Sequence, residues 1–181
     1  EAIDIIVIDK SETIAQELRL VSNSDQALRW VAGVQYFTQD RFRSLATTFL
    51  GTPVPPAAQD LELEDVAAFG HLSYDLSDDL ELTLAFRYDE ETPSDKTQGR
   101  SESFRELQPK ASLAYRFHGG LLGYVTVGKG FRAGGFNNLA PGSNFQPGFD
   151  EESLLSYEIG FKGNTADGRL RVAGSLFYID Y

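Results

Sequence analysis

The sequence predicts an all-β fold: an antiparallel up-and-down meander of about eight strands that forms part of a transmembrane outer-membrane β-barrel. Three observations support this prediction. Apolar and polar residues alternate with a period of two in many segments, as in strands with two different faces. The connections between these segments alternate between short and long. No run of eighteen apolar residues is present, which excludes a helical membrane span but not a barrel.

The expected strands follow from this alternation, and the clearest case is 80–91. There Leu80, Leu82 and Leu84 share one face, while Glu81 and Arg87 lie on the other. Segments 105–117 and 153–164 repeat the pattern, and 63–76 does so less cleanly because Phe69 falls on the polar face. The full set of expected strands is 12–21, 27–41, 63–76, 80–91, 105–117, 121–130, 153–164 and 169–181.

Residues 1–11 have two interpretations. Ile3, Ile5 and Val7 either begin a strand or are the remnant of a loop from a preceding strand. We therefore treat 1–181 as one partial barrel domain with an ambiguous first segment. The chain begins at Glu1 and contains no Met, so it is expected to be a fragment or a processed product.

The connections differ systematically in length. Short turns are expected at 22–25, 77–79, 118–120 and 165–168, where Gly, Asp and Asn favour tight hairpins. Long loops rich in Pro, Gly, Asn and Ser are expected at about 44–61, 92–104 and 131–152. All tight turns therefore fall at one end of the sheet and all long loops at the other, an asymmetry typical of outer-membrane barrels.

Composition excludes several functional classes. The chain has 16 Lys and Arg against 27 Asp and Glu, a net charge of −11 that disfavours nucleic acid as a partner. It contains no Cys, which excludes disulfides, thiolate metal sites and Cys nucleophiles. With only His71 and His118, a His-rich metal cluster is excluded, and we expect no metal site and no cofactor.

The polar faces carry full charges in mid-strand, which a polar barrel lumen would accommodate. Many aromatic residues fall near strand ends, as interfacial girdles require, so outer-membrane lipid is an expected partner of the apolar faces. The charges predicted to face the lumen are Glu17, Arg19, Glu81, Arg87, Lys110, Arg116, Glu158, Lys162, Arg169 and Arg171.

Three segments resemble the barrel of TonB-dependent outer-membrane receptors. They are the strand 16–20 followed by Ser22, the strand and loop start 124–137 (YVTVGKGFRAGGFN), and 152–163 (ESLLSYEIGFKG) with the strand after it. The middle segment is the most specific, and the order and separations of the three also match the family. The resemblance covers about residues 12–181.

The resemblance implies a function that composition does not. Such receptors have a barrel of about 22 strands closed by an N-terminal plug. They take up ferric siderophores or other large scarce ligands with energy passed through TonB, in the outer membrane of Gram-negative bacteria. The plug and the TonB-contact segment are missing from this chain, whose eight strands would be about a third of the barrel. The implied partners are therefore the plug and TonB, through the missing part, and an imported ligand.

No catalytic residue is predicted. The glycines of 130–137 mark a strand that bends into a loop, and no helix follows them to form a phosphate site. Candidate ligand contacts at the external mouth are Arg132, Phe136, Asn137 and Asn138. His71 and Ser73 share a face, but their separation of about 7 Å along a strand argues against a direct hydrogen bond and hence against a hydrolase.

Other functions stay open at this stage. A complete eight-stranded outer-membrane barrel with an adhesin or structural role has nearly this length. A barrel enzyme would need a Ser, His and Asp constellation at the rim, which the sequence does not reveal. A soluble ligand-carrying barrel is a further alternative, and it predicts apolar residues inside rather than outside.

Overall fold

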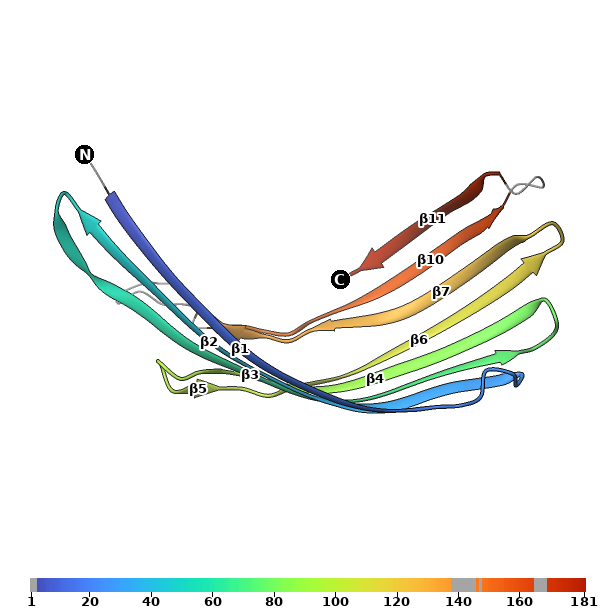
Figure 1. The fold of residues 1–181 in the computed structure, drawn as a ribbon, viewed down its shortest axis with the longest axis horizontal. Coiled ribbons are helices and arrows are strands. Elements are labelled where there is room, and N and C mark those ends of the chain that lie inside the picture. Colours follow the sequence, from blue (N-terminus) through green and yellow to red (C-terminus); the bar gives the residue numbers. More distant parts are fainter. Residues whose placement is uncertain (1–2, 138–145, 147, 165–168) are drawn as a thin grey trace.

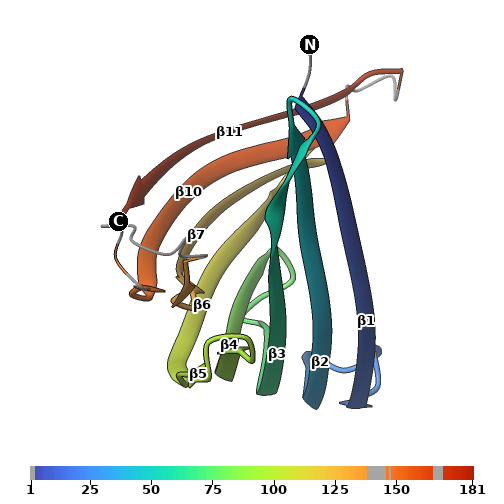
Figure 2. The same cartoon turned by 90° about the vertical axis from the view of Figure 1, so that its left-hand side faces the viewer.

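The structure, a computed structural model, describes residues 3–137, 146, 148–164 and 169–181. Eight long strands form one antiparallel meander in the order of the chain, as Figures 1 and 2 show. This confirms the predicted all-β fold. The long strands are β1 (Ile3–Val21), β2 (Leu28–Phe49), β3 (Thr52–Asp75), β4 (Leu80–Asp95), β6 (Phe104–Phe117), β7 (Leu121–Arg132), β10 (Glu152–Asn164) and β11 (Arg171–Asp180).

Three short strands complete the described part of the chain. β5 (Arg100–Ser101) pairs with β4, and β8 (Gly135–Phe136) pairs with β9 (Gly148–Phe149) in a separate two-stranded sheet. The main sheet curves into an open arch that runs from β1 to β11 in Figure 2. Each neighbouring pair of long strands is antiparallel, and the register is continuous in every pair except β2–β3, which has one shift. The register fixes the side chains that share a face.

The predicted long loop at 44–61 is wrong. β2 and β3 are 22 and 24 residues long and continue through this segment to a turn at Leu50 and Gly51. Both turn residues have positive φ, 50° and 78°, the geometry of a two-residue hairpin. Because a strand crosses a bilayer in about 9–11 residues, the two strands extend well past one crossing as a projecting hairpin, visible at the left of Figure 1.

The prolines of this segment led to the prediction of a loop. The strand register explains why β3 tolerates them. Pro53 and Pro56 lie in a part of β3 that pairs only with β2, since the β3–β4 ladder begins at Leu61 and Asp95. Proline has no N–H to donate, which is harmless on the unpaired side of a strand. The β2–β3 register shifts between Leu45 and Thr47, opposite the prolines.

The other two predicted loops also contain short strands. β4 runs to Asp95 and turns back into β5, and β8 and β9 lie within 131–152. Residues 3–11 form the first half of β1, which pairs with β2 from Ile3 to Val21. The tight turns at 22–25, 77–79 and 118–120 lie together at the opposite end of the sheet, at the right of Figure 1, whereas the turn expected at 165–168 lies outside the described residues. Gly119 and Gly120 form one of them with φ of 93° and 84°, a conformation that favours glycine.

Exposure is inverted relative to a soluble protein. Among the described residues, the buried apolar side chains are Ala67, Phe104 and Ala133, whereas dozens of large apolar side chains are exposed. In contrast, Asp89 and Asp95 are buried. A soluble barrel would bury its apolar face and expose its charges. The described part of the chain contains no helix that is long and apolar enough to cross a membrane.

Candidate functional site

The strand registers divide the sheet into two faces. The apolar face carries residues such as Val34, Leu72, Leu84, Leu113 and Ile159. The polar face, between them along each strand, carries nine of the ten charges predicted for the lumen: Glu17, Arg19, Glu81, Arg87, Lys110, Arg116, Glu158, Lys162 and Arg171. Arg169 precedes β11 and lies outside the ladders.

Arg87 is the centre of a polar network that joins four strands. Its Nε donates to Asp89 Oδ1 at 2.6 Å, and Nη2 lies 3.2 Å from Asp65 Oδ2 on β3. Nη1 donates to Gln35 Oε1 on β2 at 3.0 Å, and Gln108 on β6 donates to Asp89. The guanidinium therefore neutralises two carboxylates at once, and charge-assisted bonds of this kind are stronger than neutral ones.

A second network lies on the same face near the tight turns. Arg29 on β2 donates to both carboxylate oxygens of Asp75, at 2.6 and 2.7 Å, and to Glu81 Oε2 at 2.7 Å. Arg116 on β6 lies 3.5 Å from the same Glu81 oxygen. Four strands are thus bridged by two arginines and two acids, which keeps this part of the wall polar without leaving one charge sign uncompensated.

Two groups of charges on the polar face do not form salt bridges across strands. Glu17 and Arg19 do form an ion pair, but both belong to β1. Glu158 accepts a hydrogen bond from Tyr124 Oη of β7 at 2.6 Å instead of pairing with Lys162. Alternate residues of one strand lie on one face, so long side chains meet within a strand as well as across it.

The expectation that His71 and Ser73 are too far apart for a direct hydrogen bond is wrong. His71 Nε2 and Ser73 Oγ are 3.0 Å apart, and Ser73 Oγ also lies 3.1 Å from Thr83 Oγ1. The spacing of about 7 Å applies to the backbone, whereas side chains on one face of a strand lean toward each other. A Ser–His contact lacks the acid that orients the base in a hydrolase. The network is a hydrogen-bonded Ser–Thr–His row on the polar face.

The apolar face is apolar along only part of the strands and becomes charged beyond two tyrosines. Tyr36 and Tyr88 lie at the end of its apolar band that is farther from the tight turns, and charged residues follow beyond them. Glu90 pairs with Arg105 at 2.6 Å. Lys96 contacts Asp40 at 2.8 Å and Glu62 at 3.3 Å. The hydrogen bond to Asp40 raises the pKa of Lys96, which lies outside the strands. An apolar band with aromatic edges and a charged rim is typical of a barrel wall in lipid.

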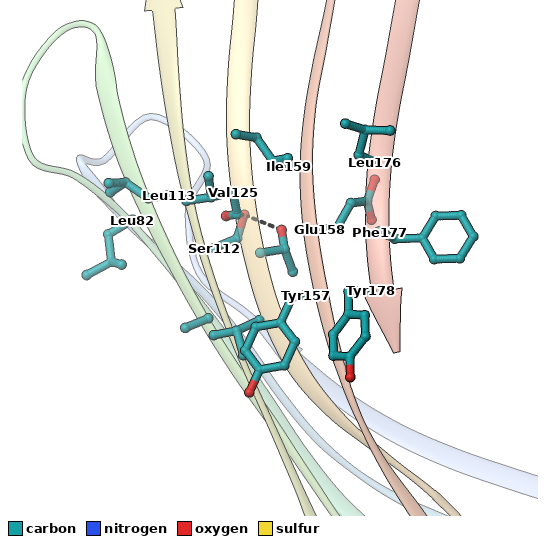
Figure 3. A pocket seen from close by; sticks show the side chains of 13 residues that line it. Leu82, Ser112, Leu113, Val125, Tyr157, Glu158, Ile159, Leu176, Phe177 and Tyr178 are labelled. Carbon is teal, nitrogen blue, oxygen red and sulfur yellow. Dashed lines mark hydrogen bonds between the residues drawn. The ribbon is translucent and has the colours of Figure 1, made fainter. Parts of the chain in front are cut away.

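One cavity lies on the apolar face and is not the candidate site. Its volume is about 570 Å³, and it lies over β6, β7, β10 and β11. Figure 3 shows its lining, where the rings of Tyr157 and Tyr178 lie side by side with centroids 6.4 Å apart. Because this surface belongs to the apolar band, it is shaped to contact hydrocarbon, and it offers few groups to orient a polar ligand.

A smaller cavity of about 270 Å³ lies at the end of the sheet opposite the tight turns, where three hairpins meet. Apolar side chains and polar groups both reach it, which suits a ligand with mixed chemistry. Glu91 lies beyond Tyr88, outside the apolar band, and burial together with Asp65 and Asp89 raises the pKa of its carboxyl. The lining includes Gln39, Leu61, Leu63, Glu91, Phe136 and Phe149. We call this cavity the mouth pocket.

The structure places the predicted ligand contacts unevenly around the mouth pocket. Phe136 lines it, and Asn137 donates from Nδ2 to the carbonyl of Gln146 at 3.0 Å. Arg132 is exposed, with its guanidinium 5.9 Å from the Phe149 ring centroid and 4.0 Å from Glu152. Asn138 lies outside the described residues.

Sequence reasoning missed most of the mouth pocket. Gln39, Leu61 and Glu91 were assigned to strand ends or to a loop, and nothing in their spacing joins them to Phe136. These segments come together because β8 folds back onto β4, with β9 paired to β8. Among the described residues, no group of three or more His, Asp or Glu side chains is positioned to hold a metal ion.

Solved structures share this architecture. The ferric yersiniabactin uptake receptor FyuA of Yersinia pestis matches 99% of this chain with a TM-score of 0.80 at 17% identity. The copper transporter OprC matches 97% with a TM-score of 0.75 at 14% identity. The ferripyoverdine receptor of the Pseudomonas aeruginosa outer membrane matches 98% with a TM-score of 0.70 at 18% identity.

At these identities the likeness shows the fold alone. This chain spans 30%, 30% and 26% of the lengths of those three proteins, respectively. A family model described as TonB dependent receptor-like, beta-barrel matches residues 9–181. The members of this family are transporters rather than enzymes. The antiparallel meander, the inverted exposure and this match lead to one conclusion: the chain belongs to the TonB-dependent receptor-like β-barrel family.

Proposed function

We propose that this chain is a wall segment of an outer-membrane receptor that imports a large, scarce ligand, with a ferric siderophore as the leading substrate. Family membership and the siderophore receptors among the similar structures support the class of ligand. The observation that carries the proposal is the mouth pocket, where three external hairpins of one wall converge. The receptor is located in the outer membrane of a Gram-negative bacterium, with lipid against the apolar face.

The polar face has a specific role in this proposal. It lines the lumen, and the charges of the Arg87 and Arg29 networks are neutralised within the wall. A charged ligand therefore passes a polar but largely compensated surface and is not trapped by one strong countercharge. We propose this lumen-facing role for the ten predicted charges, including Arg169.

The external residues provide the initial binding. Arg132 offers a charge-assisted hydrogen bond to an anionic ligand, and Phe136 and Asn137 add an aromatic surface and an amide; Asn138 is proposed on sequence grounds alone. The plug and the TonB contact belong to other parts of the receptor. TonB pulls the plug to open the lumen, and this segment 1–181 contributes wall, charge and loops without covalent chemistry.

Uptake by cells tests the proposal. The gene is deleted in the source bacterium, and uptake of radioactive iron is measured for a panel of purified ferric siderophores under iron limitation. We expect one ligand to lose uptake in the deletion strain, and wild-type uptake of that ligand to stop when TonB is deleted or the proton gradient is collapsed. Unchanged uptake of every ligand in the panel would contradict the siderophore assignment.

The size of the native polypeptide separates the receptor from a small complete barrel. Outer-membrane fractions are compared by immunoblot with and without boiling. A heat-modifiable band several-fold larger than the 20.0 kDa of this chain is expected for the receptor. A band of about that mass would mean that eight strands close on themselves, which would favour an adhesin or structural role.

A further inference from the structure

A buried carboxylate lies at the base of the mouth. Asp95, at the end of β4, is fully buried with 0% exposure. Its Oδ1 accepts a hydrogen bond from the Gln98 amide at 3.1 Å, and its Oδ2 lies 3.4 Å from Arg100 Nη2. Gln59 Nε2 of β3 approaches the same Oδ2 at 3.5 Å. Since an unpaired buried charge is strongly unfavourable, the arginine is required where Asp95 is ionised.

Arg100 makes two further contacts to a different external segment. Nη2 donates to the backbone carbonyl of Asn137 at 3.3 Å. The guanidinium carbon lies 4.8 Å from the centroid of the Phe136 ring, within the range of a cation–π interaction. One side chain thus links the β4–β5 hairpin to the described residues 133–137 and 148–149, which we call the strap.

The strap is packed closely against the sheet. A Cβ added at Gly134 would lie 2.5 Å from the Phe104 ring and 2.5 Å from the carbonyl oxygen of Phe149. Phe104 itself is only 5% exposed, and Ala133 is buried. The backbone at Gly134 therefore lies directly on the Phe104 ring with no space for a side chain, so that small shifts would break this contact.

The strap forms one wall of the mouth pocket. Phe136 and Phe149 come from the strap, whereas Leu61 and Leu63 come from β3. The pocket therefore has its observed shape only when the strap lies against the sheet. The β8–β9 pairing joins the strap to itself and not to the main sheet. The hydrogen bond from Arg100 to the Asn137 carbonyl links the strap to the β4–β5 hairpin, beside the contact of Arg132 on β7 with the Phe149 ring.

We propose that Arg100 is a positioning residue that holds the strap in place and so preorganises the mouth pocket. That the mouth pocket binds the ligand rests on the proposed function. That Arg100 holds the strap does not depend on it. Arginine suits the role because its planar fork serves a carboxylate and a carbonyl while its face stacks on a ring. Lysine has one compact charge and cannot satisfy all three partners together.

The test uses hydrogen–deuterium exchange in the full receptor, without ligand. Arg100→Ala is expected to speed exchange in peptides covering the strap by about tenfold or more. Phe136→Leu, which keeps the Asp95–Arg100 pair, is expected to give a smaller increase, and Arg100→Lys an intermediate one. Arg105→Ala is the matched control, because Arg105 pairs with Glu90 on the apolar face and does not touch the strap.

Two readouts separate positioning from general destabilisation. The global unfolding midpoint is expected to stay unchanged in Phe136→Leu. In a double-mutant cycle, Arg100→Ala with Phe136→Leu is expected to exchange no faster than Arg100→Ala alone, because both remove one contact. Additive effects, or strap exchange in Arg100→Ala equal to that in Arg105→Ala, would overturn the proposal. Because no ligand is used, failure of the siderophore assay leaves this result unaffected.

Discussion

The ring of Phe69 lies directly over Gly33 on the polar face: a Cβ added at Gly33 would be 2.4 Å from Phe69 Cζ and 2.8 Å from the Leu18 carbonyl oxygen. The two residues are direct cross-strand partners on β2 and β3. The ring reaches across β2, so that Arg19 of β1 lies 5.9 Å from its centroid. An aromatic side chain on an otherwise polar face is thus accommodated by a glycine, a device that also covers the bare backbone of that glycine.

Gly33→Ala is expected to destabilise the receptor by about 1–3 kcal/mol, because Phe69 and the backbone of β1 must both move. Unfolding in urea from lipid vesicles measures the change. Gly128→Ala is the control: it lies on the same face, and its added Cβ would make an ordinary contact with Lys110 Cγ at 3.4 Å. Equal effects of the two substitutions would show that glycine content, and not the Phe69 contact, sets the stability.

Removing Arg87 is expected to destabilise the wall more than removing an exposed arginine. Arg87→Ala leaves Asp65 and Asp89 without their cation, and the Asp89 side chain is 7% exposed. We expect a loss of about 1–3 kcal/mol after allowing for the partial exposure of Arg87. Arg105→Ala breaks a pair that is 60% and 40% exposed, for which about 0–1 kcal/mol is expected.

The same urea measurement compares these two variants. If Arg105→Ala lowered the free energy of unfolding as much as Arg87→Ala, burial of the ion pair would not determine its contribution to stability. Asp89→Asn combined with Arg87→Met is expected to recover part of the loss, because it removes a buried charge together with its partner.

The assignment of faces is tested by neighbouring residues on β6. Leu113→Arg places a charge in the apolar band, where about 2–4 kcal/mol of destabilisation is expected in lipid. Ala114→Arg places the same charge on the polar face, opposite Glu81, and is expected to be tolerated. Folding yield and urea stability in vesicles report both. Loss of folding in Ala114→Arg with normal Leu113→Arg would reverse the two faces.

Glu91 is expected to make stability depend on pH. Burial and the charges of Asp65 and Asp89 raise its pKa above the ordinary value of 4.5. A carboxyl with a raised folded-state pKa lowers stability when ionised, so its cost is present at neutral pH and disappears as pH falls through that pKa. Glu91→Gln is therefore expected to raise the thermal midpoint at pH 7, with the difference shrinking in acid. A difference that is independent of pH would contradict this origin.

The comparison between sequence and structure is most instructive at the prolines of β3. Alternation identified the cores of all eight long strands, because a half-buried strand must place one residue type on each face. It failed at 44–61, where Pro53 and Pro56 indicated a loop but form part of a strand. Whether a proline interrupts a strand depends on which side is unpaired, and pairing partners are decided by topology and not by local sequence.

The sequence by itself determined the meander, the two chemically distinct faces and the family, since these depend on residue order along single strands. Only the tertiary structure decided which side chains of different segments contact each other on these faces. It brought Arg87 to Gln35 and Asp65, His71 to Ser73, and Arg100 to Phe136. Side-chain contacts across strands and the seating of the strap depend on register and close packing, which no single segment specifies.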